Sequence, residues 1–131
     1  AKARELMKEF DVRGAGELIA GGELSGGNQQ KAVIAREIDR DPELLIVSQP
    51  TRGLDVGAIE YIRKRIIAER DKGKAVIVVS FELDEILDMS DRIAVIYDGA
   101  IQGILDPAET NKQDLGILMA GGQLNKEEAN V

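Results

Sequence analysis

Ser25, Gly26 and Gly27 open a predicted helix and could bind phosphate. The first amides of an α-helix have no hydrogen-bond partner within the helix, and the helix dipole favours an anion there. Two glycines would also let a ligand approach the backbone closely. The same residues could instead be an ordinary helix start, in which the Ser25 hydroxyl caps the first turn and the glycines only shape the path of the chain.

A second set of polar residues stands where a predicted strand ends. The apolar run at residues 44–47 predicts a strand buried on both faces, and Ser48 and Gln49 follow at its carboxyl end. Open α/β sheets place their ligand groups at this end. A hydroxyl and a neutral amide, however, cannot accept a proton as a carboxylate can. Asp55 precedes the next predicted helix and could be its N-cap.

Alternating helices and strands must position these groups. Helices are predicted at residues 1–10, 25–39, 56–72, 82–87 and 114–119, and strands at 44–47, 75–79, 92–97 and 100–105. Asp98 and Gly99 between the last two strands predict a hairpin turn. This order indicates an α/β fold with a mostly parallel sheet flanked by helices and a C-terminal β-hairpin. The polar residues 123–131 are expected to form a disordered tail.

Composition limits the classes of partner. The 131 residues, 44% of them hydrophobic, suffice for one domain with a buried core. A net charge of −7 without a basic patch argues against a nucleic-acid partner. The absence of cysteine and histidine excludes disulfides and the commonest metal ligands. Because no apolar run reaches the length of a membrane span, any membrane role is expected to act through a partner.

Two segments together resemble one family. Residues 24–30, Leu-Ser-Gly-Gly-Asn-Gln-Gln, resemble the signature loop of ATP-binding-cassette (ABC) ATPases, and residues 49–55, Gln-Pro-Thr-Arg-Gly-Leu-Asp, resemble their Walker B/D-loop segment. The order and spacing are those of the family. The resemblance identifies residues 1–122 as the C-terminal portion of an ABC nucleotide-binding domain, with a partial P-loop NTPase-like fold. Asn28 and Arg52 are typical of the simple-sugar and nucleoside importers, whose second cassette the chain resembles most.

The resemblance implies an ATP-binding subunit of a nucleoside or simple-sugar importer, peripheral to the cytoplasmic face of the cell membrane. In that family the signature loop acts in trans. Across a head-to-tail dimer it caps the γ-phosphate of ATP that the partner cassette holds with Mg²⁺. The implied partners are a second ABC cassette, transmembrane permease subunits and, indirectly, an extracytoplasmic substrate-binding protein. The implied cofactor-binding residues are Ser25, Gly26, Gly27, Asn28, Gln29 and Asp55.

The acidic chemistry of the family is missing. Ser48 and Gln49 stand where the family has Asp-Glu, and Phe81 stands where it has a histidine that contacts the γ-phosphate; Gln49 and Phe81 are expected only to pack. No G-x-x-x-x-G-K-[S/T] motif occurs, and in the family that loop and the Q-loop lie upstream. We therefore expect part of a longer domain with a degenerate site of its own, in which no residue is catalytic and none binds metal. ATP hydrolysis would belong to the full assembly.

Two other functions stay open on the sequence. A non-transport ABC ATPase, of the DNA-repair or ribosome-associated kind, would be expected to keep the acidic pair and the switch histidine. A non-enzymatic α/β regulatory module would need the signature match to be nothing more than a helix cap. Upstream sequence distinguishes the three, because a P-loop strand and turn or a coiled-coil insertion would lie there.

Overall fold

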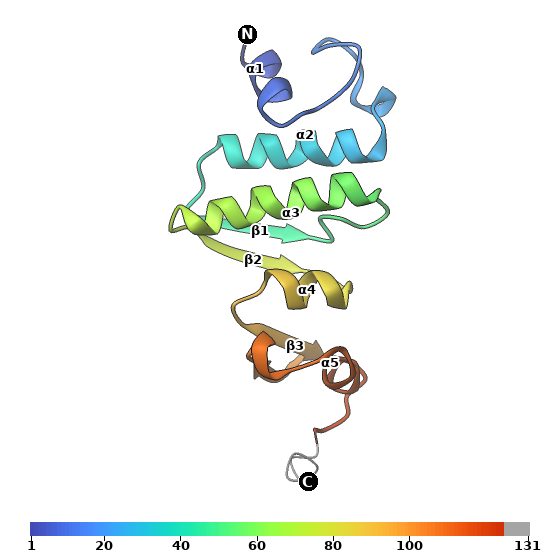
Figure 1. Cartoon of the computed structure of the whole chain (residues 1–131), viewed down its shortest axis with the longest axis vertical. Helices are drawn as coiled ribbons and strands as arrows, with labels where there is room; N and C mark the ends of the chain where they lie inside the picture. The colour runs from blue at the N-terminus through green and yellow to red at the C-terminus, as the bar shows by residue number, and fades with distance from the viewer. Residues whose placement is uncertain (125–131) are drawn as a thin grey trace. The chain divides into compact units, whose positions relative to one another are not determined.

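Three α-helices and one pair of strands make up the first half of the chain. The computed structural model describes residues 1–124 and divides the chain into two compact units, Ala1–Val79 and Ser80–Val131. The first unit holds α1 (Lys2–Glu9), a 3₁₀ turn η1 (Gly21–Glu23), α2 (Gly26–Asp39), β1 (Leu44–Ser48), α3 (Val56–Asp71) and β2 (Ala75–Val79) (Figure 1).

The end of α3 shows how a sequence signal becomes a helix boundary. Gly73 takes a φ of 89°, a left-handed conformation that glycine adopts without steric cost. Its amide donates to the Arg70 carbonyl at 2.8 Å, and the Lys74 amide donates to the Glu69 carbonyl at 3.3 Å. These two bonds form a Schellman motif, which satisfies the last carbonyls of the helix. The predicted helix 56–72 is thereby confirmed to within one residue.

The strands β1 and β2 pair in parallel, with Leu44 opposite Ala75 and Ser48 opposite Val79. α3 packs against β2 of this pair, and Leu45 and Val47 of β1 are buried. The expectation that the strand at 44–47 is buried on both faces is wrong for this chain, because Leu44 is 49% exposed and Ile46 is 61% exposed. Successive side chains of a strand point to opposite faces, and no residue of the first unit covers the second face.

The second unit is built around a hairpin. β3 (Ile93–Tyr97) and β4 (Ala100–Leu105) pair antiparallel, and the turn between them has a φ of 47° at Asp98 and 73° at Gly99. Positive φ at both positions is the geometry of a type I′ turn, as the Asp-Gly pair predicts. Within residues 1–124, β3 pairs only with β4, so the strands form two separate sheets of two strands each, one in each unit.

Helices of the second unit pack on this hairpin. α4 (Leu83–Met89), a 3₁₀ turn η2 (Pro107–Glu109) and α5 (Lys112–Met119) complete the unit. Its core consists of the buried side chains Ile93, Val95, Leu115 and Leu118. α5 starts two residues earlier than predicted because the Asn111 side chain accepts a hydrogen bond from the Asp114 amide at 2.9 Å.

Two expectations remain, one about the carboxyl-terminal tail and one about membrane-spanning helices. Residues 123 and 124 belong to no helix or strand, and residues 125–131 lie outside the described residues, so the expected disorder of residues 123–131 stays a prediction. No helix within residues 1–124 is both long and apolar enough to span a bilayer.

Candidate functional site

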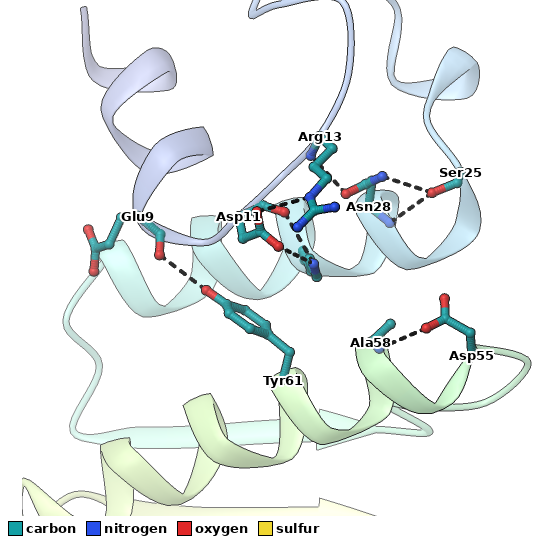
Figure 2. Close-up of polar contacts among 9 residues, drawn as sticks. Glu9, Asp11, Arg13, Ser25, Asn28, Asp55, Ala58 and Tyr61 are labelled. Carbon is teal, nitrogen blue, oxygen red and sulfur yellow. Dashed lines mark hydrogen bonds and ion pairs between the residues drawn. The ribbon is translucent and has the colours of Figure 1, made fainter.

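The fold brings the starts of α2 and α3 together. A Cβ atom placed on Gly27 would lie 3.2 Å from the Cβ of Ala58 and 3.7 Å from Oδ2 of Asp55. Figure 2 shows Ser25 and Asn28 at the start of α2, with Asp55 and Ala58 at the start of α3 below them. Two segments that are separated in the sequence therefore form one site.

Ser25 is the N-cap of α2. Its Oγ accepts hydrogen bonds from the Asn28 side-chain amide at 2.9 Å and from the Asn28 backbone amide at 3.4 Å. The Ser25 carbonyl accepts from the Gln29 amide at 2.8 Å. The amides of Gly26 and Gly27 have no acceptor among residues 1–124. A helix start with two unused amides and a hydroxyl beside them fits a phosphate group.

The two glycines of this turn differ in the space that is available for a side chain. A Cβ on Gly26 would meet only Cδ2 of Leu54, at 4.0 Å, which is ordinary van der Waals contact. A Cβ on Gly27 would press on the Cβ of Ala58. That atom is fixed by the backbone of α3, so no side-chain rotation can move it away. Gly27 is thus needed for the close approach of the two helices, whereas Gly26 leaves open space beside the free amides.

The amide side chains at the next two positions brace the loop. Asn28 Oδ1 accepts a hydrogen bond from the Arg13 backbone amide at 2.8 Å, and its Nδ2 donates to Ser25. Gln29 Nε2 donates to the Leu24 carbonyl at 2.9 Å. Both of these predicted binding residues therefore use their side-chain amides for contacts inside the chain.

Residues 9–13 form a support for α2 that sequence reasoning missed. Asp11, at a φ of 49°, receives Lys31 Nζ at 3.1 Å on Oδ2 and at 3.2 Å on its carbonyl. The hydrogen bond from Arg13, together with that from Lys31, lowers the pKa of the Asp11 carboxyl below its ordinary value of 3.8. The Tyr61 hydroxyl donates to the Glu9 carbonyl at 3.1 Å (Figure 2). The contacts of Lys31 and Tyr61 join residues far apart in the chain, so no local pattern signals them.

At the end of β1, the backbone of Gln49 has a structural role. Its amide donates to the Val79 carbonyl at 2.7 Å, and its φ is 49°. Neither Ser48, the last residue of β1, nor Gln49 carries a carboxylate, and this pair does not fit the Mg²⁺ and proton-transfer chemistry of an Asp-Glu pair. Phe81, which was expected to pack, is 70% exposed in this chain.

Asp55 caps α3. Its Oδ1 accepts a hydrogen bond from the Ala58 amide at 3.0 Å, which confirms the N-cap interpretation. Its second oxygen faces Gly27 across the gap between the helices. The six predicted binding residues thus cluster around the starts of two neighbouring helices, although a nucleotide contact of each one stays a prediction.

Comparison with known proteins finds relatives that are named as import ATP-binding proteins. No family model matches. Over 95% of its length the chain is 75% identical to "Nucleoside import ATP-binding protein NupA" of Lactococcus lactis subsp. cremoris. It is 61% identical to "Guanosine import ATP-binding protein NupO" of Bacillus subtilis over 92% of its length, and 44% identical to "Ribose import ATP-binding protein RbsA" of Lacticaseibacillus paracasei over 91%. The chain spans about a quarter of the length of these relatives, 24% in each case.

Solved structures of similar fold are ABC cassettes. The cassette MJ0796, described as a dimeric bacterial ABC transporter cassette, superposes with a TM-score of 0.71 at 27% identity, over 81% of this chain and 46% of that one. The same cassette bound to ADP and Pi gives a TM-score of 0.70 at 27% identity, over 79% of this chain and 44% of that one. The predicted partial P-loop NTPase-like fold of the ABC type is confirmed by these superpositions.

Proposed function

The chain has the fold of the ABC ATPase cassettes and is homologous to ATP-binding proteins of nucleoside and sugar import, and on that premise we propose that it lends its signature loop to an ATP site on a partner cassette. The transported substrate class would be nucleosides or simple sugars. Residues 1–122 would be the C-terminal portion of a nucleotide-binding domain, corresponding to the second cassette of a tandem protein.

The start of α2 is the observation that carries the proposal. Two amides without acceptors, at Gly26 and Gly27, and the Ser25 hydroxyl lie together at the positive end of a helix of 14 residues. Each of these groups donates a hydrogen bond, and terminal phosphate oxygens accept them. When bound, ATP would supply the phosphate that this turn caps. The chain's own contribution would be to hold three donors in place and to present them to the partner.

The end of β1 supports a division of labour between two sites. Gln49 can donate and accept hydrogen bonds, but it cannot remove a proton from an attacking water. A site that uses Ser48 and Gln49 would therefore not turn over. Hydrolysis would occur at the other site, where Ser25, Gly26 and Gly27 complete the phosphate contacts, and Asp55 would lie at the seam between the cassettes.

The proposed assembly follows from the relatives' names and from the dimeric ABC cassette. Nucleoside, guanosine and ribose import are named for the relatives, and import requires a membrane permease. We place the protein peripherally at the cytoplasmic face of the membrane, with permease subunits as direct partners and a substrate-binding protein as an indirect one. Mg²⁺ would be held with ATP by the partner cassette, because the Ser48-Gln49 pair offers no carboxylate.

Paired substitutions in the complete importer test the proposal. Ser25→Ala removes a donor from the phosphate cap without adding bulk, and substrate uptake should fall by about ten- to a hundredfold, the range of a hydrogen bond to a charged group. Gln49→Ala keeps the backbone bond to Val79 and should leave uptake within about threefold of normal, because no proton transfer depends on the side chain.

Uptake by the two variants is compared at equal protein levels, and the test is the difference between their losses. Similar losses from both substitutions would mean that the site at Gln49 turns over. An unchanged rate of uptake for Ser25→Ala would mean that the signature match is only a helix cap, as the regulatory-module alternative requires.

A further inference from the structure

The side-chain amide of Asn28 is engaged at both ends. Its Oδ1 accepts from the Arg13 backbone amide at 2.8 Å, and its Nδ2 lies 2.9 Å from Ser25 Oγ. The backbone N–H of Arg13 can only donate, so the oxygen of Asn28 must face it. The amide orientation is therefore fixed, and the nitrogen must be the atom that faces Ser25 (Figure 2).

This orientation determines what the Ser25 hydroxyl can do. A hydroxyl oxygen accepts through two lone pairs and donates one proton. Both acceptor positions of Ser25 are directed at Asn28, one at the side-chain amide and one at the backbone amide. We propose that Asn28 is a positioning residue that holds the Ser25 hydroxyl as a donor toward a phosphate oxygen, an inference that rests on the proposed function.

The distances show that the side chain matters more than the backbone. The bond from the Asn28 backbone amide is 3.4 Å long, beyond the usual range for N–H···O bonds, whereas the bond from Nδ2 is 2.9 Å. In a common capping box, the third helical residue reaches back with an acceptor to the N-cap backbone. Asn28 instead brings a donor to the N-cap hydroxyl.

The support behind Asn28 is itself fixed. The Arg13 amide lies two residues after Asp11, which is held to α2 by Lys31. The Lys31 side chain is only 11% exposed, and its Nζ lies 4.7 Å from the centroid of the Tyr61 ring. A mostly buried cation with three contacts keeps this segment on α2. The chain of contacts therefore runs from α3, through residues 9–13, to the Ser25 hydroxyl.

A double-mutant cycle in the complete importer separates positioning from mere structural support. Asn28→Ala should lower the rate of ATP hydrolysis by about three- to tenfold, the range for one neutral hydrogen bond. Ser25→Ala should lower it by about ten- to a hundredfold. In the Ser25→Ala background, Asn28→Ala should change the rate by less than about twofold, because its effect passes through the hydroxyl. Gln113→Ala, which removes an exposed amide side chain from a helix outside the signature loop, is the control and should stay within about twofold of normal.

Two further measurements keep the test decisive. If Ser25→Ala leaves too little hydrolysis to measure, the same cycle is run on the affinity for a non-hydrolysable ATP analogue. Hydrogen exchange of the Arg13 amide gives a readout apart from nucleotide, and Asn28→Ala should remove its protection while Ser25→Ala should not.

The outcomes distinguish the inference from its premise. An equal loss from Asn28→Ala in both backgrounds, or an unchanged Arg13 exchange rate, overturns the positioning role while the proposed function stands. No loss from Ser25→Ala overturns the proposed function and, with it, the inference. Coupled losses with faster Arg13 exchange support it.

Discussion

Gly26→Asp is expected to leave the stability of the protein unchanged while it blocks the proposed phosphate contact. The new Cβ would have only the Leu54 side chain nearby, at 4.0 Å, so the substitution fits without a shift of the backbone. An acidic residue in the first turn of a helix is favourable, by about 0.3–1 kcal/mol. We therefore expect the thermal midpoint of the protein to stay unchanged or to rise slightly.

The same carboxylate should abolish the proposed phosphate contact. Two unit charges about 4 Å apart repel by about 1 kcal/mol in bulk water and by about 4 kcal/mol at an effective dielectric constant near 20. A site between two cassettes is nearer the second case, so ATP hydrolysis by the complete importer should fall by up to about a thousandfold. Gly26→Asn is the matched control, since it adds nearly the same volume without charge, and it should retain much more activity.

Steady-state hydrolysis and thermal unfolding are measured on all three proteins. If Gly26→Asp folds normally and still hydrolyses ATP at the normal rate, no phosphate approaches the start of α2. If Gly26→Asn loses as much activity as Gly26→Asp, the space beside the amides matters and the charge does not.

Three more outcomes can be checked. Gly27→Ala should lower the free energy of unfolding by about 1 kcal/mol through overpacking on Ala58, and Gly27→Ala combined with Ala58→Gly should recover most of that loss in urea denaturation. The ion pair of Asp41 with Lys74 lowers the pKa of Asp41 below 3.8 and raises the pKa of Lys74 above 10.5. The stabilisation that this ion pair gives should be present between pH 3.8 and pH 10.5. It should be lost as the pH falls through the folded pKa of Asp41 or rises through the folded pKa of Lys74. A pH series of melting curves would show no such shoulders in Lys74→Met. The isolated chain should self-associate through its exposed sheet face, as measured by light scattering, and Ile46→Thr should reduce this association. A monomeric wild-type chain would contradict the reasoning. In calorimetry the isolated chain should bind ATP no tighter than millimolar.

Local chemistry made much of this fold predictable. The helix from Val56 to Asp71 has an aspartate before it and a glycine after it, and both act as the caps that such residues usually form. The Asp98-Gly99 turn is equally local, because its backbone conformation depends on those two residues. The signature and D-loop segments were recognisable for a different reason, since each is a short run of consecutive residues that resembles a family pattern.

The parts that escaped prediction depend on contacts between distant residues. Lys31 looks like an ordinary solvent-facing helix residue until Asp11 is seen beside it. Ile46 looks buried because apolar runs usually are, but burial needs a covering element, and the first unit, Ala1–Val79, provides none. The packing role of Gly27 also escaped prediction, because only the structure shows that a side chain at this position would meet α3.

The close approach of Gly27 and Ala58 has an evolutionary consequence. A Cβ atom on Gly27 would lie 3.2 Å from that of Ala58, so the two helix starts have room for one methyl group and no second one. The two positions should therefore vary together among homologous sequences, with a methyl group allowed at 27 mainly where glycine occupies 58. A lineage that drifts at one position would first have to pass through a destabilised intermediate, so the glycine can persist for reasons of packing alone, even in cassettes whose signature turn has stopped meeting a nucleotide.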